Sequence, residues 1–591
     1  MIKNAPSTLT RSPWRSAICS LFVVAAVVAL VAAVASSDAV GQRVGGNGIN
    51  IANKIAPWVI EHTAYGQQAE FFVVLADQAD LSQAANWRTK ADKGLYVHKT
   101  LLNKARAAQG PILEWLRERN IERQSFYIVN AILVKGTRQI AAELATRQDV
   151  ARIEGNPRIQ NNLPQPEAFN EVSSQSSVAH PIAIEPGIQY THAPDVWALG
   201  FMGEGITMAS ADTGVRWTHN ALKPHYRGWD GQNADHDYNW HDSIHDSVGN
   251  PCGNDSPEPC DDLGHGSHTT GTMIGDDGAG NQIGMAPGAK WIGCRNMDAN
   301  TGTPARYIEC MQWFLAPTRI DGSDPDPTKA PDITNNSWEC PSSEGCSAGT
   351  LQAAVEAQAA AGIMMVSAAQ NSGPGCSTVQ NPPGIYAATY SVGALNTGTD
   401  IIAGFSSRGP VTADGSNRIK PDITAPGTNT RSAFNDSDSS YANLSGTSMA
   451  TPHIAGALAL LWNAVPSLRH QLTDSRDTLN NAAVHISSTL CGDAGPPNNV
   501  YGWGRVDILA AVQGGGTPSP TPTATPTATA TIPPSPTPTA TPTTTPPPSP
   551  SPTPSSPGGS PTPTPTAIPT STPTEPPRVT PRPRPTPHSR P

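Results

Sequence analysis

The 591-residue sequence is poor in several features that define other classes of protein. Aromatic residues make up only 6% of it and charged residues 15%. Glycine does not recur at every third position, which excludes a collagen-like triple helix. Only one long apolar run is present, which excludes a membrane protein with several spans. No CxxC pair occurs, and a zinc site is therefore the weaker interpretation of the cysteines.

Proline has an ordinary frequency except at the C-terminal end, where residues 517–591 hold 28 of the 59 prolines. Residues 514–591 are rich in Pro, Thr and Ser and cannot bury a core. We predict a disordered, extended tail there that acts as a spacer. The remaining roughly 480 residues suit two or three domains.

The apolar run Ala17–Ala35 follows Lys3, Arg11 and Arg15 and ends in small residues. This pattern is typical of a secretory signal peptide, predicted here as residues 1–35. An uncleaved N-terminal anchor is the alternative, because the run is long enough to span a membrane. Either way the rest of the chain is exported, so we expect a secreted, extracellular protein or one associated with the cell surface.

Basic side chains are scarce in residues 163–516, where 15 stand against 35 acidic ones, a net charge of −20. Such a segment repels nucleic acid and is soluble outside the cell. Residues 36–162 carry a net charge of +4 and are expected to attract the acidic segment 163–516. We expect no nucleic-acid partner, no stable membrane insertion once the signal peptide is removed, and a monomer.

Eight of the nine cysteines lie between Cys252 and Cys491. An even number of cysteines in an exported chain predicts disulfides. The sequence does not determine the pairing, but short loops favour Cys252–Cys260 and Cys294–Cys310.

The pattern of residues 70–160 predicts a small α+β domain with an antiparallel sheet and no catalytic constellation. A polar linker, residues 163–186, follows it. The expected strands are Phe71–Leu75, Ser125–Val134 and Val150–Glu154, and the expected helices are Tyr96–Asn120, broken or kinked at Pro111, and Gln139–Arg147.

A larger domain, residues 187–513, alternates short apolar runs with helical stretches. Buried runs between helices predict an α/β fold, a parallel sheet with helices on both faces. The active site of such a sheet lies at the carboxyl ends of its strands. The runs are Ile206–Ala211, Lys290–Cys294, Asp332–Ser337, Ile363–Ala369 and Ser391–Leu395.

Four residues in this domain fit nucleophilic catalysis. Asp212 ends a strand-like run, and His265 and Ser448 each open a helical stretch. A serine hydroxyl needs a base, which His265 supplies, and Asp212 orients and stabilises the imidazolium. Asn371 offers a neutral donor to an oxyanion, together with the backbone N–H of Ser448.

These segments resemble those of the subtilisin-like serine peptidases, the subtilases. The likeness covers about Gly187–Ala511 and rests on ADTG, GHGSH and GTSMATPH around Asp212, His265 and Ser448, while Gly373–Pro383 resembles the bacillopeptidase F type. It implies a serine endopeptidase that hydrolyses extracellular proteins or peptides through an acyl-enzyme, with no cofactor required. The substrate-binding segment it implies is Asn336, Ser337, Trp338 and Glu339, with substrate added as a strand beside Asn335–Trp338.

Residues 70–162 resemble the inhibitory propeptide of this family. The resemblance implies a zymogen in which residues 36–162 are the propeptide and inhibitor, removed by the enzyme's own cut after Asn162. Ile159 then stands fourth before the scissile bond, where an apolar subsite is common in the family. The small side chains of Asn161 and Asn162 suit a crowded primary pocket.

The sequence departs from the family at two positions of the site. Gln370 stands where glycine usually precedes the oxyanion asparagine, which puts the backbone angles of this loop in question. Glu339 replaces another common glycine and is expected to narrow the primary pocket or attract basic residues.

The histidines outside the motifs have competing interpretations. His268 and His453 are expected to be buried structural residues. The insertion Trp217–Leu263 is rich in His and Asp, and is interpreted as a solvated loop, with a structural calcium ion or, less favoured, zinc as alternatives; no metal ligand is assigned.

Two other functions remain open. An inactive homologue would serve as a surface binding protein displayed on the tail. A peptidase of narrow specificity would process few substrates rather than scavenge many.

Overall fold

The computed structural model describes residues 53–166, 183–492 and 494–514. The predicted signal peptide, the middle of the linker and the tail beyond Gly514 lie outside the described residues. Within the described ranges, we find no helix that combines the length and the apolar character needed to cross a membrane.

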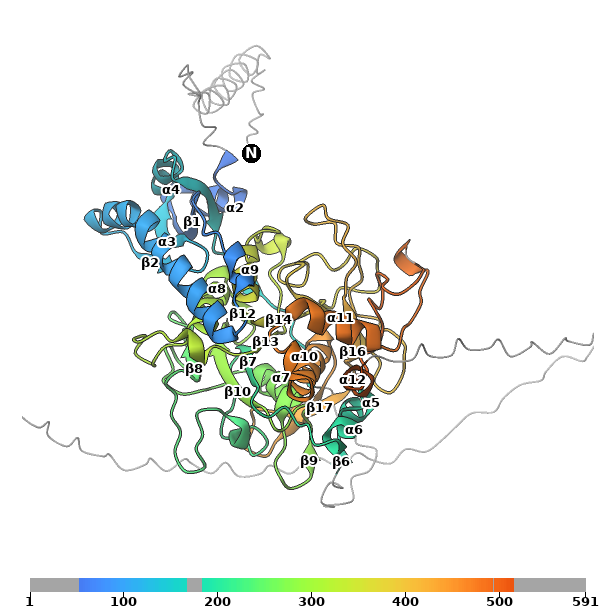
Figure 1. The fold of residues 1–591 in the computed structure, drawn as a ribbon. Helices are drawn as coiled ribbons and strands as arrows, with labels where there is room; N and C mark the ends of the chain where they lie inside the picture. The colour runs from blue at the N-terminus through green and yellow to red at the C-terminus, as the bar shows by residue number, and fades with distance from the viewer. Residues whose placement is uncertain (1–52, 167–182, 493, 515–591) are drawn as a thin grey trace, which may run out of the picture. The chain divides into compact units, whose positions relative to one another are not determined.

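A seven-stranded parallel sheet forms the centre of the larger domain (Figure 1). Its strand order is β16-β15-β14-β13-β7-β10-β8. All five runs singled out in the sequence supply strands, which confirms the predicted fold class, and β8 and β16 complete the sheet. The strands are β7 (Thr207–Asp212), β8 (Trp240–Asp242), β10 (Lys290–Arg295), β13 (Ile333–Asn336), β14 (Met364–Ala368), β15 (Tyr390–Leu395) and β16 (Ile423–Pro426).

Helices cover both faces of this sheet because side chains alternate along each strand. Met364 and Val366 of β14 belong to one core, and Met365 belongs to the other. The first core includes α7 (His265–Ile274) and α10 (Thr447–Ala464), and the second includes α8 (Pro304–Leu315) and α9 (Gln352–Ala360). The described part of this domain also contains the helices α5 (Pro186–Tyr190), α6 (Ala193–Ala198), α11 (Leu472–Ala482) and α12 (Ile508–Val512).

The N-terminal domain is an antiparallel sheet of order β2-β3-β1-β4 with helices against it. Here one expectation was wrong. The run Ser125–Val134 is not one strand, because a turn with Asn130 at φ 38° folds it into a hairpin. The helix α3 continues through Pro111, so of the break or kink expected there the break does not occur. The elements are α2 (Pro57–His62), β1 (Gln68–Leu75), α3 (Lys90–Glu118), β2 (Arg123–Phe126), β3 (Ala131–Thr137), α4 (Arg138–Ala145) and β4 (Val150–Gly155).

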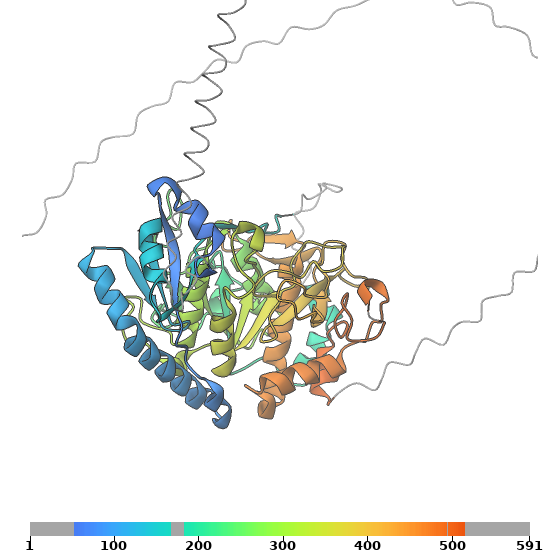
Figure 2. The same ribbon diagram turned by 90° about the horizontal axis from the view of Figure 1, so that it is seen from above.

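The hairpin of the N-terminal domain packs against α8 of the larger domain (Figure 2). Phe126 and Ile128 are buried in a core shared with Met311 and Leu315. The backbone N–H groups of Tyr127 and Ile128 donate to Oε1 of Gln312, at 2.8 and 3.2 Å. Removing the N-terminal domain would therefore expose apolar surface on the larger one.

One buried ion pair anchors the far end of this interface. Nζ of Lys90, at the start of α3, lies 2.9 Å from Oδ1 of Asp332. Arg469 contacts the other carboxylate oxygen at 3.1 Å. Burial opposes the charged form of Asp332, but these cations keep its pKa below the usual value. The basic N-terminal segment thus meets the acidic domain through a defined contact.

All eight cysteines between Cys252 and Cys491 form disulfides, and the two predicted pairs are confirmed. The pairs are Cys252–Cys260, Cys294–Cys310, Cys340–Cys346 and Cys376–Cys491. The last of them joins residues 115 apart and therefore constrains the unfolded chain most.

This pairing predicts a protein without free thiols. Mature protein treated with iodoacetamide before reduction should show no added mass, and after reduction and unfolding it should gain eight carbamidomethyl groups. Intact-mass spectrometry measures both. Four or more alkylated cysteines before reduction would contradict the pairing.

Candidate active site

Three neighbouring strands bring the first candidate residues to one edge of the sheet. Asp212 is the last residue of β7, Ser337 follows β13, and Asn371 comes three residues after β14. The strands β7, β13 and β14 are adjacent and parallel. Their carboxyl ends therefore meet, as the sequence analysis expected.

Asp212 and His265 form a buried hydrogen-bonded pair. Oδ1 of Asp212 lies 2.7 Å from Nδ1 of His265, and the two side chains are 0% and 1% exposed. The backbone N–H of Thr213 also donates to Oδ1, at 2.8 Å, and fixes the carboxylate. His265 opens α7 directly after Gly264, whose φ of 92° suits glycine. The pair can hold the imidazole with its Nε2 free to accept a proton.

Ser448 lies in the first turn of α10, which packs against α7. Its Oγ donates to the carbonyl oxygen of Ser337 at 3.3 Å. Nε2 of His265 is buried and makes no hydrogen bond to any residue that the structure describes. The serine hydroxyl is therefore turned toward the end of β13 rather than toward the histidine.

The side chain of Asn371 is held by Thr447. Its Oδ1 accepts hydrogen bonds from N and Oγ1 of Thr447, both at 2.9 Å. This fixes the amide so that Nδ2 faces Gly446. A Cβ on Gly446 would lie 3.6 Å from Nδ2 of Asn371 and 3.7 Å from N of Ser448. Two nitrogen atoms that can donate hydrogen bonds thus lie within 4 Å of one point beside the serine.

The end of the N-terminal domain runs along the edge of this site as a strand. β5 (Ile159–Gln160) pairs antiparallel with β12 (Thr301–Gly302), which also pairs with β11 (Met297–Asp298). The backbone N–H of Asn161 continues the ladder to the carbonyl oxygen of Asn300, at 2.8 Å. Among the described residues, β5 thus pairs with β12 and not with the segment Asn335–Trp338.

Residues Asn161–Pro164, which we call the pro-segment, pass through the site. Together with Ser448 and Asn371, the first three of them line a cavity of only about 20 Å³, about enough for one water molecule. A Cβ on Gly446 would come within 2.6 Å of Cγ of Pro164. The pro-segment therefore fills the space beside the serine.

The predicted substrate-binding residues divide into two groups. Ser337, Trp338 and Glu339 line the small cavity. Asn336 is not among its described lining residues, because its Nδ2 donates to Oγ1 of Thr334 at 3.1 Å within the sheet. Burial raises the pKa of Glu339, whose Oε2 accepts from Nδ2 of Asn381 at 2.7 Å.

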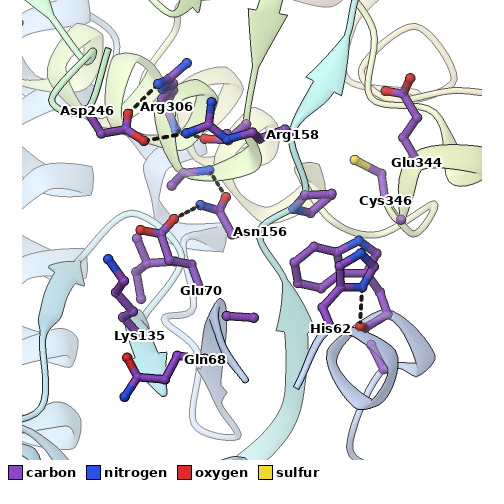
Figure 3. Close-up of a pocket in the computed structure, with 18 of the residues that line it drawn as sticks. His62, Gln68, Glu70, Lys135, Asn156, Arg158, Asp246, Arg306, Glu344 and Cys346 are labelled. Atoms are coloured by element: carbon purple, nitrogen blue, oxygen red, sulfur yellow. Dashed lines mark hydrogen bonds and ion pairs between the residues drawn. The ribbon is translucent and has the colours of Figure 1, made fainter. Parts of the chain in front are cut away.

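A wider groove of about 1630 Å³ lies between the two domains (Figure 3). In it Asp246 lies between two arginines, contacting Nη2 of Arg306 and Nη2 of Arg158, the latter at 2.9 Å. Asn156 accepts from the backbone N–H of Ala305, at 2.9 Å, in the first turn of α8. Polar contacts thus hold the chain just before β5 against the larger domain.

The His- and Asp-rich insertion uses its side chains in contacts within the protein. Nε2 of His241 and Nε2 of His245 lie 2.8 and 3.0 Å from Oε1 of Glu309. Hydrogen bonding to Glu309 raises the pKa of His245 to about 9. Asp242 pairs with Arg295 at 2.8 Å. Across residues 53–166, 183–492 and 494–514, no three His, Cys, Asp or Glu side chains are grouped as a metal site.

His268 and His453 are buried and bond to backbone carbonyl groups, as expected for structural histidines. Nε2 of His268 lies 3.0 Å from the oxygen of Thr430, and Nδ1 of His453 lies 2.8 Å from that of Met449. Burial lowers their pKa values to about 3 and about 4. Both therefore stay neutral near pH 7.

Gln370 adopts a backbone conformation that glycine would take without cost, with φ at 78°. Its buried side chain compensates through two hydrogen bonds. Nε2 donates to the carbonyl oxygen of Asn381 at 2.6 Å, and Oε1 accepts from the backbone N–H of Gln380 at 3.1 Å. The residue before Asn371 therefore keeps a positive φ, the conformation that glycine adopts easily, although it is glutamine here.

Two residues of the site were assigned no role from the sequence. Thr447 orients the amide of Asn371. Tyr307, on the first turn of α8, bonds to the pro-segment residue Asn161 through its Oη at 2.8 Å. Thr447 lies in the GTSMATPH motif but was given no role of its own, and Tyr307 lies in no pattern that distinguishes it from an ordinary helix residue.

The conformation of Gln370 generates a prediction on stability. Gln370→Ala keeps the unfavourable φ and loses both side-chain bonds, while Gln370→Gly loses the bonds but relieves the backbone. We expect the alanine variant to be less stable than the glycine variant by about 1 kcal/mol. Chemical denaturation measures the difference. Equal stability of the two variants would show that the φ of residue 370 carries no strain.

Comparison with known proteins gives the family. The model of the subtilase family matches residues 203–504. Bacillopeptidase F of Bacillus subtilis is 33% identical over 497 residues, which cover 78% of this chain and 32% of that protein. The chain therefore spans about a third of its length.

Two further relatives each match a little over half of the chain. Serine protease AprX of Bacillus subtilis is 31% identical over 56% of this chain and 72% of its own length. Subtilisin Savinase of Lederbergia lenta is 29% identical over 55% of this chain and 98% of its own length. The predicted enzyme class, a subtilisin-like serine endopeptidase, is confirmed at the level of the family. The chain belongs to the subtilase family.

Proposed function

We propose that this chain is a secreted serine endopeptidase that is made as a self-inhibited precursor. The observation that carries the proposal is the pro-segment, which fills the cavity beside Ser448 and Asn371. A strand of the precursor's own chain in that place resembles a bound peptide substrate. The family and the buried Asp212–His265 pair support the same chemistry.

The proposed reaction begins with a rotation of the Ser448 side chain. Its Oγ leaves the carbonyl oxygen of Ser337 and hydrogen-bonds to Nε2 of His265, the one ring nitrogen not bonded to Asp212. Oγ then attacks the substrate carbonyl carbon while Nε2 takes its proton. The peptide nitrogen leaves with that proton, and water releases the acyl group by the reverse sequence. Asp212 stabilises the imidazolium through the bond to Nδ1.

The substrate oxygen becomes negative in this attack. Nδ2 of Asn371 and the backbone N–H of Ser448 are the proposed donors, because both nitrogen atoms lie within 4 Å of one position beside Gly446. Their geometry is fixed before the reaction, so little reorganisation is needed. The N-terminal end of α10 adds a favourable dipole.

Export, partners and cofactors are parts of the same proposal. The apolar run Ala17–Ala35 and the four disulfides support secretion to an oxidising environment. Substrates are extracellular proteins or peptides, and the enzyme is a monomer inhibited by its own propeptide, residues 36–162. No cofactor is required for the reaction, and any calcium ion has a structural role.

An inactive homologue that binds surfaces is the alternative function. A binding protein would not need the buried Asp212–His265 pair. Burying these polar groups costs free energy of folding, which catalysis would justify. This favours the peptidase.

Removing a triad member should abolish most of the activity. Ser448→Ala, His265→Ala and Asp212→Ala are each expected to lower turnover by about four to six orders of magnitude, the scale known for subtilisin. Hydrolysis of a casein substrate measures it, and Ser440→Ala serves as a serine control away from α10. Near-wild-type activity of purified Ser448→Ala protein would refute the triad.

Self-processing is tested by the precursor of the same variant. Wild-type protein is expected to begin between about Leu163 and Gly187, after a first cut following Asn162 and later trimming. Ser448→Ala protein should retain residues 70–162, because no acyl-enzyme can form. N-terminal sequencing of both proteins from a protease-free host measures this. Cleavage of the variant at the same bond would mean that another enzyme processes the chain.

A further inference from the structure

The side chain of Asn161 is enclosed by the larger domain although it belongs to the N-terminal one. It is 2% exposed, and both polar atoms of its amide are bonded. Nδ2 donates to Oη of Tyr307 at 2.8 Å, and Oδ1 accepts from the backbone N–H of Glu339 at 3.0 Å. We call these two groups, Oη of Tyr307 and N–H of Glu339, the amide pocket.

The orientation of the amide in this pocket is fixed by chemistry. The backbone N–H of Glu339 can only donate, so the oxygen of the Asn161 side chain must face it. The NH₂ group is then directed to Oη of Tyr307, which can accept. Burial raises the pKa of Tyr307, and the phenol stays protonated. An apolar side chain here would leave both pocket groups buried without a partner.

The pocket is rigid because its members are held by packing. The ring of Tyr307 stacks on Trp338 with centroids 3.9 Å apart and planes inclined by 10°. Nε1 of Trp338 in turn donates to the carbonyl oxygen of Ala211 at 3.0 Å. A Cβ on Gly302 would lie only 2.0 Å from Oη of Tyr307, so glycine is needed to leave the hydroxyl in place. Rigid donors and acceptors discriminate between side chains more sharply than mobile ones.

Charge around the pocket adds discrimination against an acidic side chain. Glu339 and Glu344 both interact electrostatically with Tyr307. The carboxylate of Glu344 also accepts from the backbone N–H of Gln160 at 2.9 Å, one residue before Asn161. Aspartate at the position of Asn161 would bring a third carboxylate to this site, where burial disfavours the charged form.

We propose that the mature enzyme selects substrates that carry asparagine at the position of Asn161, through the amide pocket of Tyr307 and Glu339. This rests on the proposed function, since the pro-segment is taken as a substrate in place. With the first cut after Asn162, the selected asparagine is the second residue before the scissile bond. The enzyme is then a peptidase of restricted specificity rather than a general scavenger.

Wild-type mature enzyme and a set of quenched fluorescent peptides test the selection. The parent peptide carries residues 156–166, Asn-Pro-Arg-Ile-Gln-Asn-Asn-Leu-Pro-Gln-Pro, and the others replace Asn161 by Leu, Ala or Asp. We expect kcat/KM to fall at least about tenfold for Leu, which is nearly isosteric, and further for Asp. Mass spectrometry checks that all peptides are cut at the same bond.

The enzyme side is tested with Tyr307→Phe, which removes only the hydroxyl. The ratio of kcat/KM for the Asn peptide over the Leu peptide is expected to fall at least about fivefold. Tyr390→Phe is the matched control, because Oη of the buried Tyr390 bonds to the amide oxygen of Asn480 at 2.7 Å within the other core. The control should keep the wild-type ratio.

The outcomes separate this inference from the proposed function. If the Leu and Asn peptides are cleaved within twofold of each other, the selection is overturned while the peptidase activity stands. If no peptide and no casein is hydrolysed, the proposed function fails and the inference fails with it. If Tyr307→Phe protein does not fold, the peptide series on wild-type enzyme decides alone.

Discussion

Three adjacent parallel strands that end at one edge of the sheet set the geometry on which the site depends. Parallel pairing in register places the ends of β7, β13 and β14 side by side. Asp212, Ser337 and Asn371 therefore come together although about 160 residues of sequence separate the first from the last. The two helices that carry His265 and Ser448 pack on the same face of this sheet and complete the group.

The N-terminal domain occupies the site because the end of its chain pairs with a strand of the larger domain next to it. β5 adds to β12, and the pro-segment then continues past Ser448. Glycine at position 446 leaves room for this path, because a Cβ there would lie 2.6 Å from Cγ of Pro164. Glycine at position 302 leaves room for the hydroxyl of Tyr307, which a Cβ would approach to 2.0 Å. The apolar contacts of the hairpin with α8 and the Lys90–Asp332 ion pair hold the domain at two further points.

The sequence predicted most of what depends on local patterns. Apolar runs located five of the seven strands, and short motifs singled out Asp212, His265, Ser448 and Asn371. It did not predict features that depend on tertiary contacts. The sequence around Asn130 is a continuous run of β-branched and aromatic residues, yet the chain turns there to form a hairpin. The hydrogen-bond partners of the Gln370 side chain lie ten and eleven positions further along the chain. Tyr307 contacts Asn161, the residue after β5, and this contact between two domains has no signal in the local sequence.

In the proposed mechanism, Ser448 is the nucleophile and the Asp212–His265 pair activates it. Labelling with a fluorophosphonate probe tests it most directly, because this reagent reacts with serines whose hydroxyl is activated. Peptide mapping of labelled mature enzyme by mass spectrometry should place the adduct on Ser448, and His265→Ala protein should remain unlabelled. An active enzyme that carries no adduct on Ser448, or a His265→Ala variant labelled at the wild-type rate, would contradict the account.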